Sequence, residues 1–354
     1  MFKMDKVINF GIPHVGELIF ESIDTPGLIQ CALVSETWKV FAENVLIKRW
    51  KGKFFEACQN GETKVVQLLL EHCNSEESGL NIKDKYGRTA FMVACNHGHK
   101  GVVKLLLDHS QHNIELNAKD NYGWTAFMLA CLKGYKDVVK LILDNSDRIE
   151  LNARSSSGRT ALMRACFSGH KDVVKLLLGH SDQNIELNAR DENGKTAVMF
   201  ACGNGHKNVV KLLLQNSERI DLNARNVVGW TALMFACNYG RKSIVKLLLK
   251  NSERNIDLNA RCNNGHTVFM LACSEGHKDV VKLLLNHSQH NNIELNAKDP
   301  HRWTAMMFAC QYGRKNIVKL LLENSEVVDI NIPFFPISKE IKKLIKRHQI
   351  TVRK

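Results

Sequence analysis

The chain has 354 residues, with 49 Lys or Arg against 36 Asp or Glu, and its formal net charge is +13. It contains no apolar run of the roughly 18 residues that a membrane-spanning helix needs. Its first residues also lack the apolar stretch and cleavage site of a secretory signal. We therefore expect an ordered globular protein that is not secreted and has no membrane span, in the cytoplasm or the nucleus.

The first predicted domain covers residues 1–52. Residues 12–50 read IPHVGELIFESIDTPGLIQCALVSETWKVFAENVLIKRW. Pro26 and Gly27 mark a turn between helices. The apolar residues that follow, from Leu28 to Phe41, recur at helical spacing. The pattern predicts a small three-helix domain.

This stretch resembles an F-box, whose pattern is Leu-Pro, Glu-Ile or Glu-Leu, Ile before Asp, Leu after a turn, and Val-Ser-x-x-Trp. F-boxes bind the Skp-type adaptor of a cullin–RING ubiquitin ligase. The resemblance implies that the surface pressed on the adaptor comprises Ile12, Pro13, Leu18, Ile23, Leu28, Val34 and Trp38. Some of these side chains, Trp38 above all, could instead form the core of the small domain. An alternative is that residues 1–52 only cap the array that follows, since stacked repeats need a terminal cap.

Residues 53–332 consist of a repeated unit. A Thr opens seven copies, at spacings of 36, 35, 36, 35, 36 and 37 residues: Thr89, Thr125, Thr160, Thr196, Thr231, Thr267 and Thr304. Each copy runs through an apolar stretch such as AFMLAC, a Gly, the stretch VVKLLL, a polar loop, and a segment such as LNAKDNYG. This order predicts two helices and a hairpin, with Thr as N-cap and Gly as C-cap. Gly123 is predicted to have positive φ in its hairpin. Two such short helices bury their apolar faces only by stacking on neighbouring copies.

The unit resembles the ankyrin repeat nearly letter for letter in ACNHGHKGVVKLLL, and an eighth, opening copy at 54–70 lacks the Thr. The resemblance implies an all-α solenoid preceded by the F-box-like domain. Two departures carry predictions. Met replaces the family's His in all seven Thr-containing copies, so the hairpins must be held another way or more loosely. Arg302 stands where the other copies have Gly, which predicts a distorted last hairpin.

Eight of the eleven Cys occupy one column of the repeat. Equivalent residues of stacked helices lie about 8–10 Å apart, beyond disulfide reach, and no C-x-x-C occurs. We expect buried small side chains with no metal or disulfide, in a reducing compartment. The eight are Cys58, Cys95, Cys131, Cys166, Cys202, Cys237, Cys273 and Cys310.

The basic residues also follow the repeat. Lys or Arg lies two residues after the hairpin Asn in all seven hairpins, and Lys fills two columns of the second helix. The simplest interpretation is that these residues form solvated faces. The alternative is a basic stripe that attracts an acidic protein or nucleic acid. We do not expect nucleic-acid binding, because no further recognition feature accompanies the charge.

The last segment, 333–354, begins with Pro333 and Pro336, which end the repeat pattern. SKEIKKLIKRH predicts an amphipathic helix that caps the array and turns its Lys and Arg outward. The alternative is a basic patch for nuclear import or for an anionic surface.

The variable positions of the repeat are candidates for recognition, because ankyrin arrays bind proteins through their hairpin tips and first helices. The candidate target-binding residues precede the Thr or lie at the tips: Arg88, Trp124, Arg159, Lys195, Trp230, His266, Trp303, Tyr86 and Tyr122. Exposed Trp and Tyr are frequent hot spots of binding. The alternative for each Trp is stacking along its own hairpin.

We find no Gly-rich phosphate loop, H-E-x-x-H or G-x-S-x-G, so we expect neither an enzyme nor a cofactor or small-molecule substrate. The two resemblances imply a monomeric substrate receptor whose F-box binds the ligase adaptor and whose ankyrin groove binds an unidentified target. The chain also resembles the proteins of large DNA viruses that join an ankyrin array to an F-box, and this resemblance implies a place in the host cytoplasm. The alternative is a scaffold that sequesters a partner without ubiquitination. The Asn of each ELN or DLN segment also resembles a hydroxylation site.

Overall fold

The computed structural model describes residues 52–71, 80–109, 114–180, 185–251, 253, 256–291, 293–332 and 337–352. Within these ranges every regular element is a helix. The F-box-like segment, with its seven predicted adaptor-binding residues, lies outside the described residues. The all-α expectation is therefore met for the repeats.

The helices fall into two compact units, which we describe separately. The first unit includes the residues up to Ala130 and Asp137–Glu150, and the second includes Cys131–Lys136 and the residues from Leu151 onward. The helices that begin before residue 150 are 52–60, α5 (Thr63–Glu71), α6 (Ala90–His97), α7 (Lys100–Asp108), α8 (Ala126–Lys133), α9 (Lys136–Leu143) and the short 3-10 helix η2 (Ser146–Arg148).

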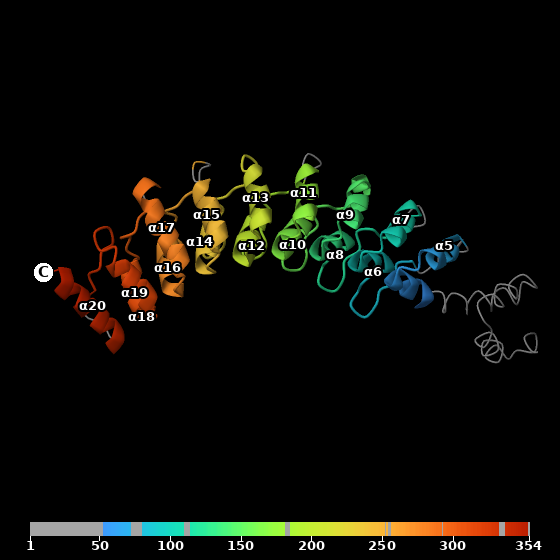
Figure 1. Cartoon of the computed structure of the whole chain (residues 1–354). Coiled ribbons are helices and arrows are strands. Elements are labelled where there is room, and N and C mark those ends of the chain that lie inside the picture. The colour runs from blue at the N-terminus through green and yellow to red at the C-terminus, as the bar shows by residue number, and fades with distance from the viewer. Residues whose placement is uncertain are drawn as a thin grey trace, which may run out of the picture. The chain divides into compact units, whose positions relative to one another are not determined.

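In the second unit, first and second helices form two layers. The first helices pack in series as α10 (Ala161–Ser168), α12 (Ala197–Asn204), α14 (Ala232–Asn238), α16 (Val268–Glu275) and α18 (Ala305–Gln311). The second helices follow the same order as α11 (Lys171–Gly179), α13 (Lys207–Gln215), α15 (Lys242–Lys250), α17 (Lys278–Asn291) and α19 (Lys315–Leu322), as Figure 1 shows. Each repeat thus rests on the next through both of its helices.

Local sequence signals set the ends of the first helices. In six of the seven repeats the Thr side-chain Oγ1 accepts a hydrogen bond from the Met N–H three residues on, at 3.3–3.4 Å. Gly98 and Gly169 end α6 and α10 with φ of 77° and 81°, and the predicted positive φ of Gly123 is 72°. A side chain would strain each of these backbones, which is why Gly recurs there.

The core is built from the invariant columns. All eight column thiols are buried, as predicted. The seven Met side chains are buried too, from fully buried at Met92 to 8% exposed at Met307. Burial raises the pKa of the Cys202 thiol to about 12, so the column is neutral at physiological pH. It serves as small apolar packing between first helices.

The final helix, α20 (Lys339–Val352), packs against α19 in the second unit. Its Ile341 side chain is fully buried, while the Lys residues at 339, 342, 343 and 346 are exposed. Lys315 of α19 forms an ion pair with Glu340. The helix therefore covers the last repeat with its apolar face and turns its basic face to solvent.

The predicted distortion of the last hairpin is wrong. Arg302 takes the left-handed conformation that Gly has in the other hairpins, with φ of 65°. Its N–H donates to Asp299 O at 2.9 Å, matching the 2.8 Å bond from Gly265 to Cys262. The geometry is kept at the cost of backbone strain, because non-Gly residues rarely adopt this region.

Candidate protein-binding surface

Six of the seven hairpins are held by a polar residue at their first turn, in place of the missing family His. Asp84 Oδ1 accepts from the N–H groups of Tyr86 and Arg88, at 2.9 and 2.8 Å. Asp120, Asp191, Asn226 and Asp299 accept in the same way, and Ser155 Oγ accepts from Arg159 N at 3.2 Å. Of the two possibilities left by the Met column, these six hairpins are thus held another way, by a side chain of the hairpin itself, whereas the seventh has Cys262 at this position.

Neighbouring hairpins are joined along their tips. Asn121 N donates to Tyr86 O at 3.0 Å in the first unit. In the second unit Val227 N donates to Asn193 O at 3.0 Å, and Asn263 N donates to Val228 O at 3.1 Å. These bonds fix the spacing of the exposed tips, so the surface they present is ordered before any partner binds.

The basic hairpin column adds a second set of ties. Arg154 Nη1 donates to Arg190 O at 2.7 Å, and Arg261 Nη1 donates to Lys298 O at 2.8 Å. Arg190 and Arg225 make the equivalent bond to the next repeat. The solvated-face interpretation is therefore incomplete for this column, because its exposed guanidinium groups also hydrogen-bond across the repeat boundary.

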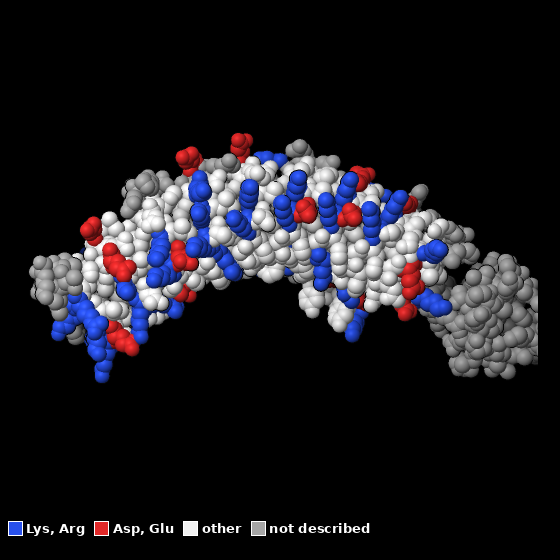
Figure 2. All heavy atoms as spheres, in the orientation of Figure 1, with Lys and Arg blue, Asp and Glu red and all other residues white. Residues whose placement is uncertain are grey.

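The second-helix lysines do form an exposed face. Figure 2 shows Lys and Arg side chains in rows over the second helices, with some acidic neighbours between them. Lys242 pairs with Asp279 of the next repeat at 3.1 Å, and Lys100 pairs with Asp137 at 3.9 Å. Such exposed pairs contribute little to stability.

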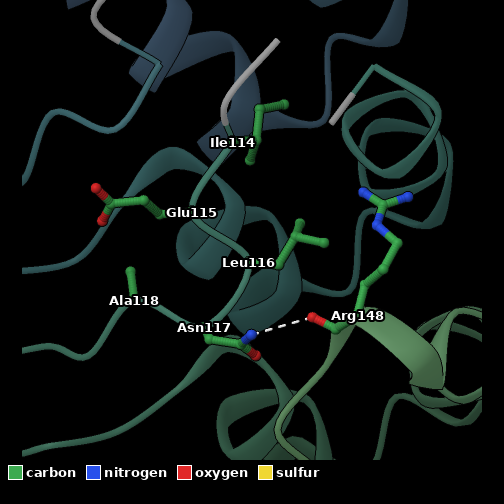
Figure 3. A pocket seen from close by; sticks show the side chains of 6 residues that line it. All are labelled: Ile114, Glu115, Leu116, Asn117, Ala118 and Arg148. Atoms are coloured by element: carbon green, nitrogen blue, oxygen red, sulfur yellow. Dashed lines mark hydrogen bonds between the residues drawn. The ribbon is translucent and has the colours of Figure 1, made fainter. Parts of the chain in front are cut away.

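The Asn of the LNA segment hydrogen-bonds to the next repeat. Asn117 Nδ2 donates to Arg148 O at 3.0 Å while its Oδ1 accepts from Glu150 N at 2.8 Å. Asn188 makes the equivalent pair with Arg219 and Asp221. A shallow pocket lies beside Asn117, lined by Ile114–Ala118 and Arg148 (Figure 3). Because both ends of the amide are used, the Asn column has a structural role whether or not it is modified.

In the first unit the four predicted site residues lie in pairs on two hairpins: Tyr86 with Arg88, and Tyr122 with Trp124. Tyr86 and Tyr122 are exposed, at 45% and 64%. Arg88 is half-buried, donates two hydrogen bonds to Asp84 Oδ2 at 2.9 and 2.7 Å, and lies 4.9 Å from the Tyr86 ring centre. Trp124 is half-buried, and its backbone N–H donates to Asp120 Oδ1 at 2.8 Å. The tips are therefore open to a partner, while Arg88 is already engaged.

In the second unit the predicted residues converge on a column of aromatic rings. The Arg159 guanidinium lies 4.7 Å from the Phe200 ring centre, and Lys195 Nζ lies 5.3 Å from that of Phe235. Trp230 packs edge-on against Phe235, with ring centres 5.1 Å apart. Each cation reaches from its own hairpin to the first helix of the next repeat.

His266 and Trp303 share a third ring, that of Phe308, at 4.8 and 5.3 Å between centres. Burial lowers the pKa of His266 below its ordinary value, although the Asp299 carboxylate 3.8 Å away opposes the shift. The imidazole is therefore neutral at physiological pH and contributes an aromatic surface rather than a charge.

The three rings that these residues contact, those of Phe200, Phe235 and Phe308, were not among the predicted site residues. They stand four residues after the Thr, where the repeats carry Val93, Leu129, Arg164, Phe200, Phe235, Leu271 and Phe308. That position changes between aliphatic residues, Phe and Arg from copy to copy, and this variation is the signal by which sequence reasoning could have found them. Variation within a fixed scaffold is what a recognition surface requires.

The comparisons agree with this architecture. The family model for ankyrin repeats, described as three copies, matches residues 54–155, 112–191, 183–262 and 253–333. The chain belongs to the ankyrin-repeat family. A comparison with curated proteins finds no match to it. Ankyrin arrays are scaffolds for protein–protein interaction, and the ordered tips and mixed aromatic and cationic column of this chain are suited to a protein partner.

Neither a metal-ligand cluster nor a membrane-spanning helix is found in the part of the chain that the structure describes. Among the residues described there, no group of three or more His, Cys, Asp or Glu is placed to hold a metal ion. No helix within the described ranges is long and apolar enough to cross a membrane.

Proposed function

We propose that this ankyrin protein is a substrate receptor of a cullin–RING ubiquitin ligase, acting as a monomer in the cytoplasm or nucleus. Residues 12–50 bind the Skp-type adaptor, and the first-helix and hairpin surface of the repeats binds the target. The observation that carries the proposal is the F-box pattern from Ile12-Pro13 to Val34-Ser35-Glu36-Thr37-Trp38, placed directly before the first repeat.

The arrangement of the chain supports this role. Helical structure of the first repeat is present from residue 52, two residues after the F-box-like stretch 12–50 ends. So short a connection leaves little freedom between an adaptor-binding domain and the repeats. A receptor needs this, because ubiquitin transfer requires a target held at a defined place. The buried cysteine thiols of the repeats support a reducing compartment.

The test is co-purification of the full chain with a eukaryotic Skp-type adaptor. Two double variants are compared. The first carries Pro13→Ala and Leu28→Ala, and the control carries Val227→Ala and Val228→Ala. The second pair removes exposed apolar side chains of a hairpin tip, at 58% and 49% exposure. We expect wild type and the tip variant to retain the adaptor, and the first variant to lose it while circular dichroism shows intact helices.

Failure of the folded wild-type chain to bind any of several adaptors would overturn the ligase role. The chain would then be an ankyrin scaffold that sequesters its partner, with residues 1–52 as a cap. Equal loss in both variants would show that the assay reports damage to the array rather than a specific adaptor contact.

A further inference from the structure

One part of the second unit combines exposed aromatic rings with cations. It comprises Arg159, Phe167, Lys195, Phe200, Phe235 and Tyr239, which we call the cation–aromatic patch. Phe167 and Tyr239 are exposed, at 42% and 51%, whereas Phe200 and Phe235 are nearly buried. The patch spans the first helices α10, α12 and α14 and the hairpins before α10 and α12.

The members of the patch form one connected surface. Phe167 packs edge-on against Phe200, with ring centres 6.0 Å apart, and Phe235 stacks with Tyr239 at 6.4 Å. Arg159 lies over both Phe167 and Phe200, and Lys195 lies near both Phe200 and Phe235. The two cations therefore link the rings of three successive repeats.

A third cation lies beneath this surface. Arg164 stands in the column where the other repeats have an apolar side chain, and it is 6% exposed. Its Nη2 donates to Ser155 Oγ at 3.2 Å, the same oxygen that accepts from Arg159 N. Ser155 occupies the position of the hairpin carboxylate in Asp84, Asp120, Asp191 and Asp299. Positive charge is thus raised twice here, by an added Arg and by a missing Asp.

Arg159 pairs with Asp191, whose Oδ2 lies 3.4 Å from Arg159 Nε. Asp191 is almost completely buried, at 1% side-chain exposure, and its Oδ1 accepts from the N–H groups of Asn193 and Lys195. Arg159 and Lys195 therefore place positive charge beside aromatic rings on a surface that is partly desolvated. A negative group of a partner gains more there than in open water.

The geometry points to a protein ligand of definite chemistry: we propose that the cation–aromatic patch binds an extended segment of the target in which carboxylate side chains alternate with aromatic or aliphatic ones. The carboxylates pair with Lys195 and Arg159. The apolar side chains cover Phe167 and Tyr239. This proposal rests on the target-binding half of the proposed function and is independent of the adaptor.

Single-stranded nucleic acid fits the patch less well. Base binding relies on open ring faces for stacking. Here Arg159 lies over the face region of Phe200, and Lys195 lies close to Phe235, so these rings are covered by the chain's own cations. Pairing of the cations with carboxylates leaves those contacts in place.

The test measures binding to the purified full chain by fluorescence anisotropy. The probes are labelled peptides of alternating Glu and Phe, Glu and Ser, and Lys and Phe, with an oligouridylate as the nucleic-acid probe. The variants are Lys195→Glu and Phe167→Ser, with Lys195→Gln as the milder change. Lys211→Glu, a charge reversal at an exposed lysine of α13, is the matched control.

We expect the Glu–Phe peptide to bind best, and Lys195→Glu to weaken it by about tenfold, the effect of losing one favourable charge contact and adding a repulsive one. Phe167→Ser should weaken the Glu–Phe peptide but leave the Glu–Ser peptide unchanged. Lys211→Glu should change affinity by less than about twofold.

Equal weakening by Lys211→Glu and Lys195→Glu would overturn the proposal, because attraction would then come from net charge alone. Tighter binding of oligouridylate than of the Glu–Phe peptide would also overturn it in favour of nucleic acid. Adaptor co-purification is read separately on the same preparations. Loss of adaptor binding with intact peptide binding refutes the ligase role alone, and the reverse result refutes the patch alone.

Discussion

The strain at Arg302 allows a sharp test of how the hairpins stack. Replacing Arg302 by Gly removes a left-handed non-Gly backbone, which costs about 1–2 kcal/mol. Gly also raises the conformational entropy of the unfolded chain, which lowers the free energy of unfolding by about 0.4–1 kcal/mol. We therefore expect Arg302→Gly to stabilise the last hairpin by about 0.5–1 kcal/mol.

The matched change is Gly229→Ala in an interior hairpin. An added Cβ there would lie 2.5 Å from Asn263 Oδ1 and 2.7 Å from Asn263 N. The next hairpin would have to move, breaking the bonds from Asn263 N to Val228 O and from Asn263 Nδ2 to Val227 O. Strain of about 1 kcal/mol and two lost hydrogen bonds of about 1 kcal/mol each give a destabilisation of about 3 kcal/mol.

Both variants can be followed by urea denaturation with tryptophan fluorescence, because Trp303 and Trp230 adjoin the altered residues. The urea midpoint should rise for Arg302→Gly and fall for Gly229→Ala. A lower midpoint for Arg302→Gly, or a loss below about 1 kcal/mol for Gly229→Ala, would refute the view that interior hairpins need Gly because the next hairpin packs against it.

Three further predictions follow from the contacts of single residues. Asn188→Ala should destabilise the array by about 1–2 kcal/mol and speed amide hydrogen exchange at Asp221, and unchanged exchange there would contradict the proposed tie. For Asp84, burial raises the carboxyl pKa but the hydrogen bonds from Arg88 outweigh it and lower it overall. Its stabilising contribution should therefore persist at neutral pH and disappear as the pH falls below about 4, so Asp84→Asn should lose less stability between pH 7 and pH 3 than wild type does. Burial raises the pKa of the Cys202 thiol to about 12, so a thiol reagent at pH 8 should label it only at the rate of unfolding, and rapid labelling of folded protein would refute its burial.

Much of the candidate surface was accessible to sequence reasoning, because the repeat aligns every copy with the others. The residues before the Thr are variable, and the structure places five of them in the second unit at or beside the aromatic column. What alignment could not reveal is which residue each one contacts. Arg159 reaches Phe200, 41 residues away, and that distance in sequence is bridged only by the stacking of two repeats.

The sequence by itself determined the repeat period, the helix pairs, the Thr and Gly caps and the buried Cys and Met columns. These features depend on short-range interactions or on periodicity, and every copy of the repeat carries the same signals. Only the tertiary structure decided how the hairpins are joined, that Arg302 keeps the turn, and that cations and rings of successive repeats form one patch. Those features depend on contacts between residues about one repeat apart, and the energy of stacking, rather than any local preference, fixes that register.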